Sequence, residues 1–308
     1  MGQRQTKPVP YDIKVIESGN VKEVYHYGET RFRGYERSQS YGASCNSLII
    51  TEVDKETGEI KTREATTEET EAIKEARKME SRATSNQRAR NNLRRLVLAN
   101  FSNSSKFITL TFRDNVTDIE LANKTFKRFI KYVNEDLTKH YGKSSKLAYV
   151  AVIEFQKRGS IHYHMICKGI PPYYRFEKVI NRWNQAIRSV VGSEGEFVGS
   201  VKIHKISHVD NVGAYVVKYM TKSDADKRLF GKKIYQTSRG LKKPTEKTYR
   251  VKSEEEYQNL MEELGIDHKK IVFRSQYQDK FTLANVEYLE INTERRTQKS
   301  CATTQNVI

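Results

Sequence analysis

Cysteine is scarce in this chain of 308 residues. The sequence contains only three, Cys45, Cys167 and Cys301, and no two of them form a C-x-x-C pair. Their odd number and wide spacing indicate neither a disulfide framework nor a cysteine-based zinc site. We therefore expect a reducing compartment.

Long apolar runs are missing as well. The longest, such as "LAYVAVI" at 147–153, are far shorter than the roughly 20 residues that a membrane-spanning helix needs. A nucleotide-binding loop is also missing, because "GKSS" at 142–145 lacks the first glycine of the phosphate-loop pattern G-x-x-x-x-G-K-[ST]. We expect a soluble protein without membrane contact and without an ATPase site of its own.

Positive charge is abundant. Lys and Arg number 55 against 38 Asp and Glu, which gives a net charge of +17 and an isoelectric point near 9.6. Such an excess predicts a polyanionic partner, and nucleic acid is favoured over an anionic membrane surface because its dense phosphates release counterions on binding. Charge alone does not identify a reaction.

The hydrophobic pattern predicts an α+β domain preceded by an extension. "SLIITEV" and "EIKTREA" around "DKETG" indicate a hairpin, and residues 67–98 a helix. The order expected after residue 101 is strand 106–112, a helix capped by Asp118, strands 146–155 and 161–167 as an antiparallel hairpin, a helix from 176, strand 199–206 and a helix over 210–222. This β-α-β-β-α-β-α order predicts a central antiparallel β-sheet with helices packed on it.

Further along, "SEEEYQNLMEEL" indicates an amphipathic helix and "HKKIVFRSQY" a strand. We expect three regions: an N-terminal extension with the hairpin and basic helix at 1–100, the main domain at 101–290, and a disordered tail at 291–308.

Two histidines alternate along one expected strand. His162 and His164 therefore share one face, and a turn in "QKRGS" brings Glu154 of the partner strand beside them. Two imidazoles and one carboxylate leave coordination positions open for water or a phosphate oxygen, as a catalytic divalent-metal site requires. The alternative is that all three are polar residues on a solvated sheet face.

The helix over 210–222 carries a polar stripe. At ~100° per residue, Tyr215, Lys218, Tyr219 and Lys222 share one side, whereas valines and Met220 lie on the other. Tyrosines that served only the core would lie on the valine side of the helix. The position of Tyr215 and Tyr219 on the opposite side therefore indicates a functional role. A neighbouring ammonium lowers the cost of a phenolate or holds a phosphate.

Two basic segments are candidate DNA-binding surfaces. The helix at 67–98 fits a solvated helix and a DNA-gripping arm equally well. Residues 218–250 contain 11 Lys or Arg against 3 Asp or Glu, with aromatic residues between them. This pattern fits a disordered basic loop or a groove that binds phosphates and stacks bases. The DNA-binding candidates are Lys222, Lys232, Lys233, Arg239, Lys242, Lys243, Arg94 and Arg95.

Three segments together resemble the HUH endonucleases, and among them the two-tyrosine rolling-circle replication initiators of small phages and plasmids. "KFITLTF" is similar to their first motif, "IHYHMI" to their histidine-hydrophobe-histidine motif and "YVVKYMTK" to their tyrosine motif, in the matching order. With the flanking "NNLRRLVLANF" and "YQTSRGLKKP", the resemblance extends over about residues 88–250.

The resemblance implies a metal-dependent nickase and strand transferase. His162, His164 and Glu154 would hold Mg²⁺ or Mn²⁺ at a scissile phosphodiester of single-stranded origin DNA, and Tyr215 or Tyr219, with Lys218 beside them, would attack the phosphorus. His204 and His208 are alternative ligands to Glu154. The implied partners are origin DNA and a host helicase, in the cytoplasm of a bacterial host cell.

Two other functions fit the same residues. A single-tyrosine HUH transposase shares the metal motif but needs only one tyrosine. A non-catalytic origin-binding regulator would keep the basic surface yet tolerate loss of Glu154, His162 or His164. The nick-site sequence and the oligomeric state stay open.

Overall fold

The computed structural model describes residues 8–34, 49–53, 60–171, 174–195, 197–221, 227–229, 231–279 and 282–294. The chain divides into two compact units, one formed by Phe32–Asn91 with the first nine residues and the other by Pro10–Arg31 with Asn92–Ile308. Within the described residues, no helix combines the length and the apolar character needed to cross a bilayer.

The smaller unit holds a hairpin and most of a long helix. Strands β3 (Ile49–Val53) and β4 (Ile60–Glu64) pair antiparallel, and α1 runs from Thr67 to Asn100. At the start of α1, the Glu69 amide donates to the Thr66 hydroxyl, and the Thr66 amide donates to the Glu69 carboxylate. This reciprocal capping stabilises the first turn. The predicted hairpin and helix are both confirmed.

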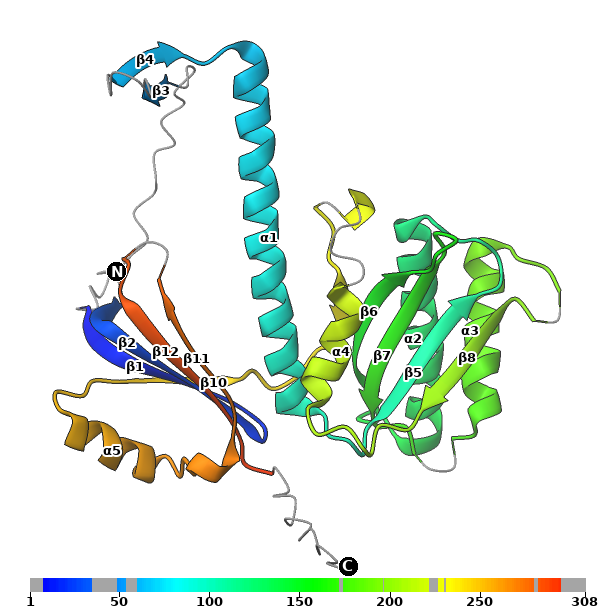
Figure 1. Cartoon of the computed structure of the whole chain (residues 1–308). Coiled ribbons are helices and arrows are strands. Elements are labelled where there is room, and N and C mark those ends of the chain that lie inside the picture. The colour runs from blue at the N-terminus through cyan, green and yellow to red at the C-terminus, as the bar shows by residue number, and fades with distance from the viewer. Residues whose placement is uncertain are drawn as a thin grey trace, which may run out of the picture. The chain divides into compact units, whose positions relative to one another are not determined.

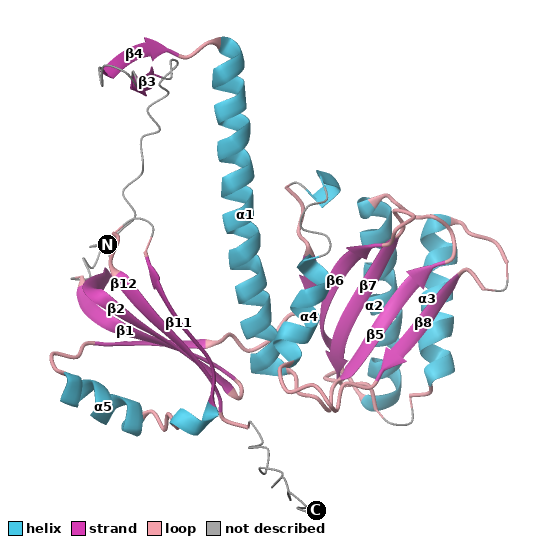
Figure 2. Ribbon diagram, in the orientation of Figure 1, coloured by secondary structure: helices cyan, strands magenta, loops and turns pink. Residues whose placement is uncertain are grey.

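The larger unit contains an antiparallel sheet in the strand order β8-β5-β7-β6-β9. Its strands are β5 (Lys106–Phe112), β6 (Ala148–Phe155), β7 (Ile161–Lys168), β8 (Gly199–His204) and β9 (Tyr235–Thr237). Its helices are α2 (Ile119–Tyr141), α3 (Phe176–Val191) and α4 (Val212–Thr221). The predicted α+β order is confirmed (Figure 2), and β9 is an addition to it.

One face of this sheet forms the main core. Alternate residues of β5, among them Leu110 and Phe112, are fully buried together with Phe126 of α2 and Trp183 of α3. Helices α2 and α3 lie behind the sheet in Figure 1. Each large apolar side chain buried there contributes roughly 1.5–3 kcal/mol to folding. Asp118 caps α2 as predicted, since its carboxylate accepts from the Glu120 amide. The opposite face is left for the site.

A second antiparallel sheet has the order β10-β1-β2-β12-β11. Its strands are β1 (Val9–Ser18), β2 (Val21–Arg33), β10 (Thr245–Tyr249), β11 (Ile271–Gln278) and β12 (Asn285–Asn292). Helix α5 (Glu254–Glu263) covers one face, with Leu260 packed near Ile13 and Leu289. Two short 3₁₀ turns, η1 (Lys227–Leu229) and η2 (His268–Lys270), complete the described elements.

The structure divides the chain differently from the expected boundaries at residues 100 and 290. Strands β1 and β2, from the expected N-terminal extension, pair with β10 and β12 from the expected main domain. The reason is physical: a local pattern reveals a strand, but it does not reveal a pairing partner more than 200 residues away in the sequence. The expected disordered tail lies outside the described residues from 295 onward.

Candidate functional site

The candidate site lies on the face of the first sheet that α2 and α3 leave uncovered. In the strand pairing, Glu154 of β6 lies opposite His162 of β7, and Thr109 of β5 lies opposite His164. Because side chains alternate along each strand, these four residues point to the same side. The predicted common face of the two histidines is confirmed.

The two imidazoles have different surroundings. His164 is buried, its Nε2 contacts the Glu154 carboxylate, and its Nδ1 lies 3.1 Å from the Thr109 hydroxyl. The Nε2 atom of His162 is buried and has no hydrogen-bond partner among the described residues. Unpaired polar atoms are rare in protein interiors. An imidazole nitrogen in this state is suited to bind a ligand that the protein itself does not supply.

Burial favours the neutral form of His162. Burial lowers the pKa of His162 below its ordinary value, Arg158 and Lys202 lower it further, and Glu154 opposes them. The neutral imidazole is the form that binds metals.

The donor types fit a divalent cation. Within the described residues, no three His, Cys, Asp or Glu side chains are already gathered into a metal cage. The orphaned Nε2 of His162 and the Nε2 of His164 beside the Glu154 carboxylate nevertheless supply two imidazoles and one oxygen donor. Mg²⁺ prefers the oxygen donor, and Mn²⁺ accepts both donor types more readily.

A basic pocket opens beside these ligands. It measures about 520 Å³ and is lined by Glu154, Gln156, Lys157, Arg158 and His162. The Arg158 guanidinium is held by the carbonyl oxygens of Phe112, at 2.9 Å, and Arg113, at 3.1 Å. A guanidinium fixed in this way is suited to receive a phosphate. Sequence patterns alone do not single out Lys157 and Arg158, although both stand in the turn between the two strands of the site.

Helix α4 brings the tyrosines onto the histidines. The ring of Tyr219 stacks on that of His164 with 3.9 Å between ring centres, and the Tyr219 hydroxyl donates to the Tyr215 hydroxyl at 3.3 Å. The Lys218 ammonium lies 3.8 Å from the centre of the Tyr215 ring. Beneath both tyrosines lies Phe107, 4.9 Å from the ring of Tyr215 and 5.4 Å from that of Tyr219. All six predicted catalytic and metal residues therefore gather in one place.

Tyr219 is protonated near neutral pH. Burial, the Tyr215 hydroxyl and the Glu154 carboxylate all raise its pKa above the ordinary value. A phenol in this state becomes a nucleophile only when its proton is removed during the reaction or when positive charge arrives nearby.

Gly213 sets the position of α4. A Cβ atom on this residue would lie 2.6 Å from the Arg94 carbonyl oxygen and 2.8 Å from Leu98 Cγ. The glycine thus allows α4 to pack directly against the last turns of α1, while Val216 and Met220 are buried as the helical pattern predicts.

Substitution of Gly213 by alanine is expected to lower the free energy of unfolding by about 1–3 kcal/mol, because the added methyl group overpacks a backbone contact. Thermal denaturation measures this effect. Ala214→Ser is the control, since Ala214 is the exposed neighbour in the same helix. Equal melting temperatures for Gly213→Ala and the wild type would contradict the packing described.

The basic candidates fall into two groups. Arg94 bridges Glu23 and Glu290 at 2.6 Å each, and Arg95 pairs with Glu23 at 2.5 Å. Glu23 is almost fully buried. This network ties α1 to the second sheet, so we leave both arginines out of the proposed DNA surface.

The other basic candidates border the first sheet. They precede or follow β9, which pairs with β6, the strand that carries Glu154. The exposed members are Lys232, Lys233, Arg239, Lys242 and Lys243. Lys222 lies outside the described residues.

The alternative ligands lie apart from the carboxylate. His204 Nε2 is 3.1 Å from the Thr109 hydroxyl, so His204 reaches His164 only through Thr109. His208 is exposed in the turn that precedes α4. These positions favour Glu154 as the third donor.

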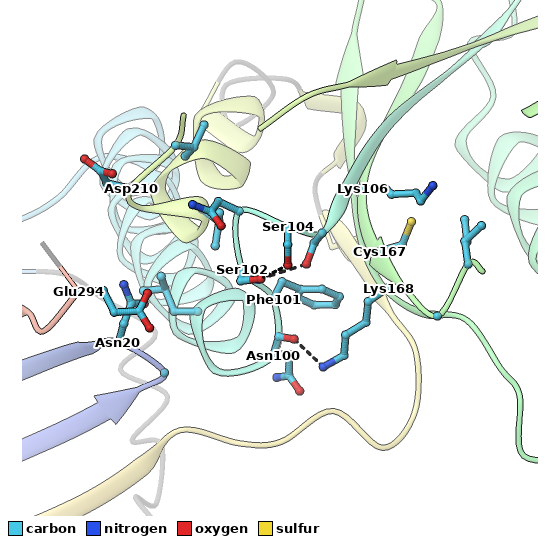
Figure 3. A pocket seen from close by; sticks show the side chains of 18 residues that line it. Asn20, Asn100, Phe101, Ser102, Ser104, Lys106, Cys167, Lys168, Asp210 and Glu294 are labelled. Atoms are coloured by element: carbon cyan, nitrogen blue, oxygen red, sulfur yellow. Dashed lines mark hydrogen bonds between the residues drawn. The ribbon is translucent and has the colours of Figure 1, made fainter. Parts of the chain in front are cut away.

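A separate pocket of about 500 Å³ lies at the beginning of β5 (Figure 3). There the Lys168 ammonium donates to the Asn100 carbonyl at 2.6 Å, and the hydroxyls of Ser102 and Ser104 are in contact. None of the predicted site residues lines it. We assign this pocket no part in the chemistry.

Comparison with known proteins supports a role in DNA replication. Residues 105–224, which extend from the start of β5 to beyond α4, match the family described as replication-associated protein ORF2/G2P. The chain is also similar to the Phasyl DNA replicon protein arp of Escherichia coli, with 31% identity over 129 residues that cover 38% of this chain and 42% of the relative. The chain therefore matches less than half the length of that curated relative. No solved structure matches the chain.

Proposed function

We propose that this protein initiates rolling-circle DNA replication by nicking single-stranded origin DNA with a tyrosine of α4, as a two-tyrosine HUH endonuclease, and later rejoins the strand. The observation that carries the proposal is the stack of the Tyr219 ring on His164, the imidazole whose Nε2 contacts the Glu154 carboxylate. An aromatic side chain placed there only for packing would not need Lys218 beside it.

The reaction is a balanced exchange of phosphodiester bonds. The tyrosine hydroxyl gives up its proton as its oxygen bonds to phosphorus, the bond from phosphorus to the 3′ oxygen breaks, and that oxygen takes up one proton and leaves as a hydroxyl. The 5′ phosphate stays on the tyrosine, so the bond energy is kept and rejoining needs no ATP. The free 3′ hydroxyl primes synthesis.

Each residue of the site has a defined task in this proposal. Glu154, His162 and His164 would hold Mg²⁺ or Mn²⁺, and the ion when bound polarises the scissile phosphate as a Lewis acid. Lys218 lies over the Tyr215 ring, where its charge lowers the cost of a phenolate. Arg158 faces the pocket at Glu154 and His162, where it would steady the phosphate.

The proposal extends to partners. Because the sequence carries no phosphate-binding loop, strand separation needs another protein, and we propose a helicase of a bacterial host for this task. The reaction would then take place in the host cytoplasm. The basic residues around β9 would hold the single strand leading to the site.

Covalent capture tests the proposal. Purified protein is incubated with a pool of single-stranded DNA and Mn²⁺, and the DNA that stays attached after denaturation is sequenced. We expect one recurrent sequence at the attached 5′ ends and no attachment in chelator. Sequence-specific binding without any covalent attachment would instead indicate a non-catalytic origin-binding regulator.

Neutralising four lysines tests the DNA surface. Changing Lys232, Lys233, Lys242 and Lys243 together to glutamine is expected to weaken single-strand binding. It should also flatten the log–log salt dependence by about 0.7 for each DNA phosphate that the protein no longer neutralises.

The matched control neutralises four exposed lysines on or just after α2, on the other side of the sheet. These are Lys124, Lys127, Lys139 and Lys143. Fluorescence anisotropy at several salt concentrations gives the slopes. The salt-dependence slope of the β9 variant must fall more than that of the control. An unchanged slope in the β9 variant, or an equal reduction in both variants, would show that the β9 segment is not part of the DNA-binding surface.

A further inference from the structure

The hydroxyl of Thr109 lies between two imidazoles. Its oxygen is 3.1 Å from Nδ1 of His164 and 3.1 Å from Nε2 of His204. Thr109 and His164 are 7% and 6% exposed. A row of polar groups, buried at Thr109 and His164, thus runs from Glu154 through these two residues to His204.

We infer that Thr109, supported by His204, is a positioning residue that makes Nε2 of His164 available to bind the metal. This inference rests on the proposed function. It gives His204 a role different from that of a direct metal ligand, because its Nε2 is directed at the Thr109 hydroxyl.

The hydrogen atoms shared by Glu154, His164, Thr109 and His204 can be arranged in two ways that give every hydrogen bond one donor and one acceptor. When Nε2 of His164 carries the hydrogen and donates to Glu154, Nδ1 is bare and accepts from the Thr109 hydroxyl. A metal on Nε2 requires the hydrogen to be on Nδ1 instead, which then donates to the Thr109 oxygen. The hydroxyl hydrogen of Thr109 must in turn find another acceptor, and Nε2 of His204 lies at the right distance.

The surroundings make the hydroxyl hard to replace by water. The Phe107 ring lies against both imidazoles, with 6.0 Å between its centre and that of His164 and 5.9 Å to that of His204. If Thr109 lost its oxygen, the Nδ1 hydrogen of metal-bound His164 would lose the acceptor that lies 3.1 Å from Nδ1. His204 itself is exposed, so water can stand in for it more easily.

Two substitutions at Thr109 separate the effect of the hydroxyl from the effect of the branched side-chain shape. Thr109→Val keeps the branched shape and removes the hydroxyl, whereas Thr109→Ser keeps the hydroxyl. Mn²⁺ binding is measured on the DNA-free protein from the electron paramagnetic resonance signal of free Mn²⁺. We expect the dissociation constant to rise roughly 10–100-fold in Thr109→Val, as for other groups that orient a metal ligand, and to stay near the wild-type value in Thr109→Ser.

Two further measurements keep the test independent of cleavage. Nitrogen-15 spectra of the histidines in metal-free protein should show a shifted Nδ1 resonance of His164 in Thr109→Val, because Nδ1 loses the hydrogen bond from Thr109, and an unshifted one in Thr109→Ser. His204→Ala should weaken Mn²⁺ binding less than Thr109→Val does. If Thr109→Val is poorly folded by thermal denaturation, Thr109→Ala takes its place.

The outcomes separate this inference from the proposed function. Wild-type protein that binds Mn²⁺ and forms the covalent adduct, together with unchanged Mn²⁺ binding in Thr109→Val, would overturn the inference and leave the proposed function standing. His204→Ala binding Mn²⁺ as poorly as His164→Ala would also overturn it, since His204 would then be a ligand. Wild-type protein that binds no Mn²⁺ would overturn both.

Discussion

Changing both Tyr215 and Tyr219 to phenylalanine is expected to abolish covalent attachment of DNA, with a loss of cleavage on the order of 10³-fold or more, because the double variant has no nucleophile. Each single variant should retain some initial cleavage, since the two hydroxyls lie 3.3 Å apart and either can reach the same phosphate. We expect Tyr219→Phe to cause the larger initial loss, because the ring of Tyr219 stacks on His164.

Both single variants should fail in repeated release of circles. In the proposed reaction, one tyrosine would still hold the 5′ end after one round of replication, so another hydroxyl would have to cleave the regenerated origin. Cleavage of an origin oligonucleotide and release of circles are measured side by side. Tyr249→Phe, in the second sheet, is the control for removal of a phenol elsewhere. Normal circle release by either single variant would indicate a single-tyrosine enzyme.

Removal of either histidine of the site has the second large expected effect. His162→Ala or His164→Ala should lower cleavage on the order of 10³-fold, because in the proposed reaction these side chains hold the ion that would stabilise the transition state. The affinity for single-stranded DNA should be almost unchanged, because the proposal assigns binding to the exposed lysines around β9. Gel analysis of cleavage and fluorescence anisotropy of binding separate the two effects.

The control for these variants is His208→Ala, which removes an exposed histidine from the turn before α4. It should cleave like the wild type. Full nicking activity of wild-type protein treated with a chelator would contradict the metal site, even if both histidine variants were inactive.

The sequence predicts the arrangement of the candidate site residues because short-range periodicity orders them, whereas their roles stay predictions. Strand β5 begins and ends at the predicted residues, Lys106 and Phe112. Alternation along a strand places His162 and His164 on one face, and a helical repeat of four places Tyr215 above Tyr219. The β6–β7 hairpin pairs Glu154 with His162, and the ring of Tyr219 in α4 stacks on His164, so the six predicted residues lie together.

Local sequence patterns do not predict the pairing of the second sheet or the partners of Arg94 and Arg95. Strand β2 pairs with β12, which follows it by more than 200 residues, and no local pattern encodes that partner. Charge counting identifies Arg94 and Arg95 as cations, but their partners Glu23 and Glu290 come from those distant strands. The contacts of Thr109 with His204 and of Gly213 with α1 are likewise visible only once the strands and helices are packed.

The central claim is that a tyrosine of α4 becomes covalently bonded to DNA. The most direct test is peptide mapping by mass spectrometry of the wild-type protein after reaction with its captured single-stranded sequence and Mn²⁺. We predict a nucleotide linked through its 5′ phosphate to Tyr215 or Tyr219. Attachment at any other residue, or cleaved DNA with no attached peptide, would contradict the account.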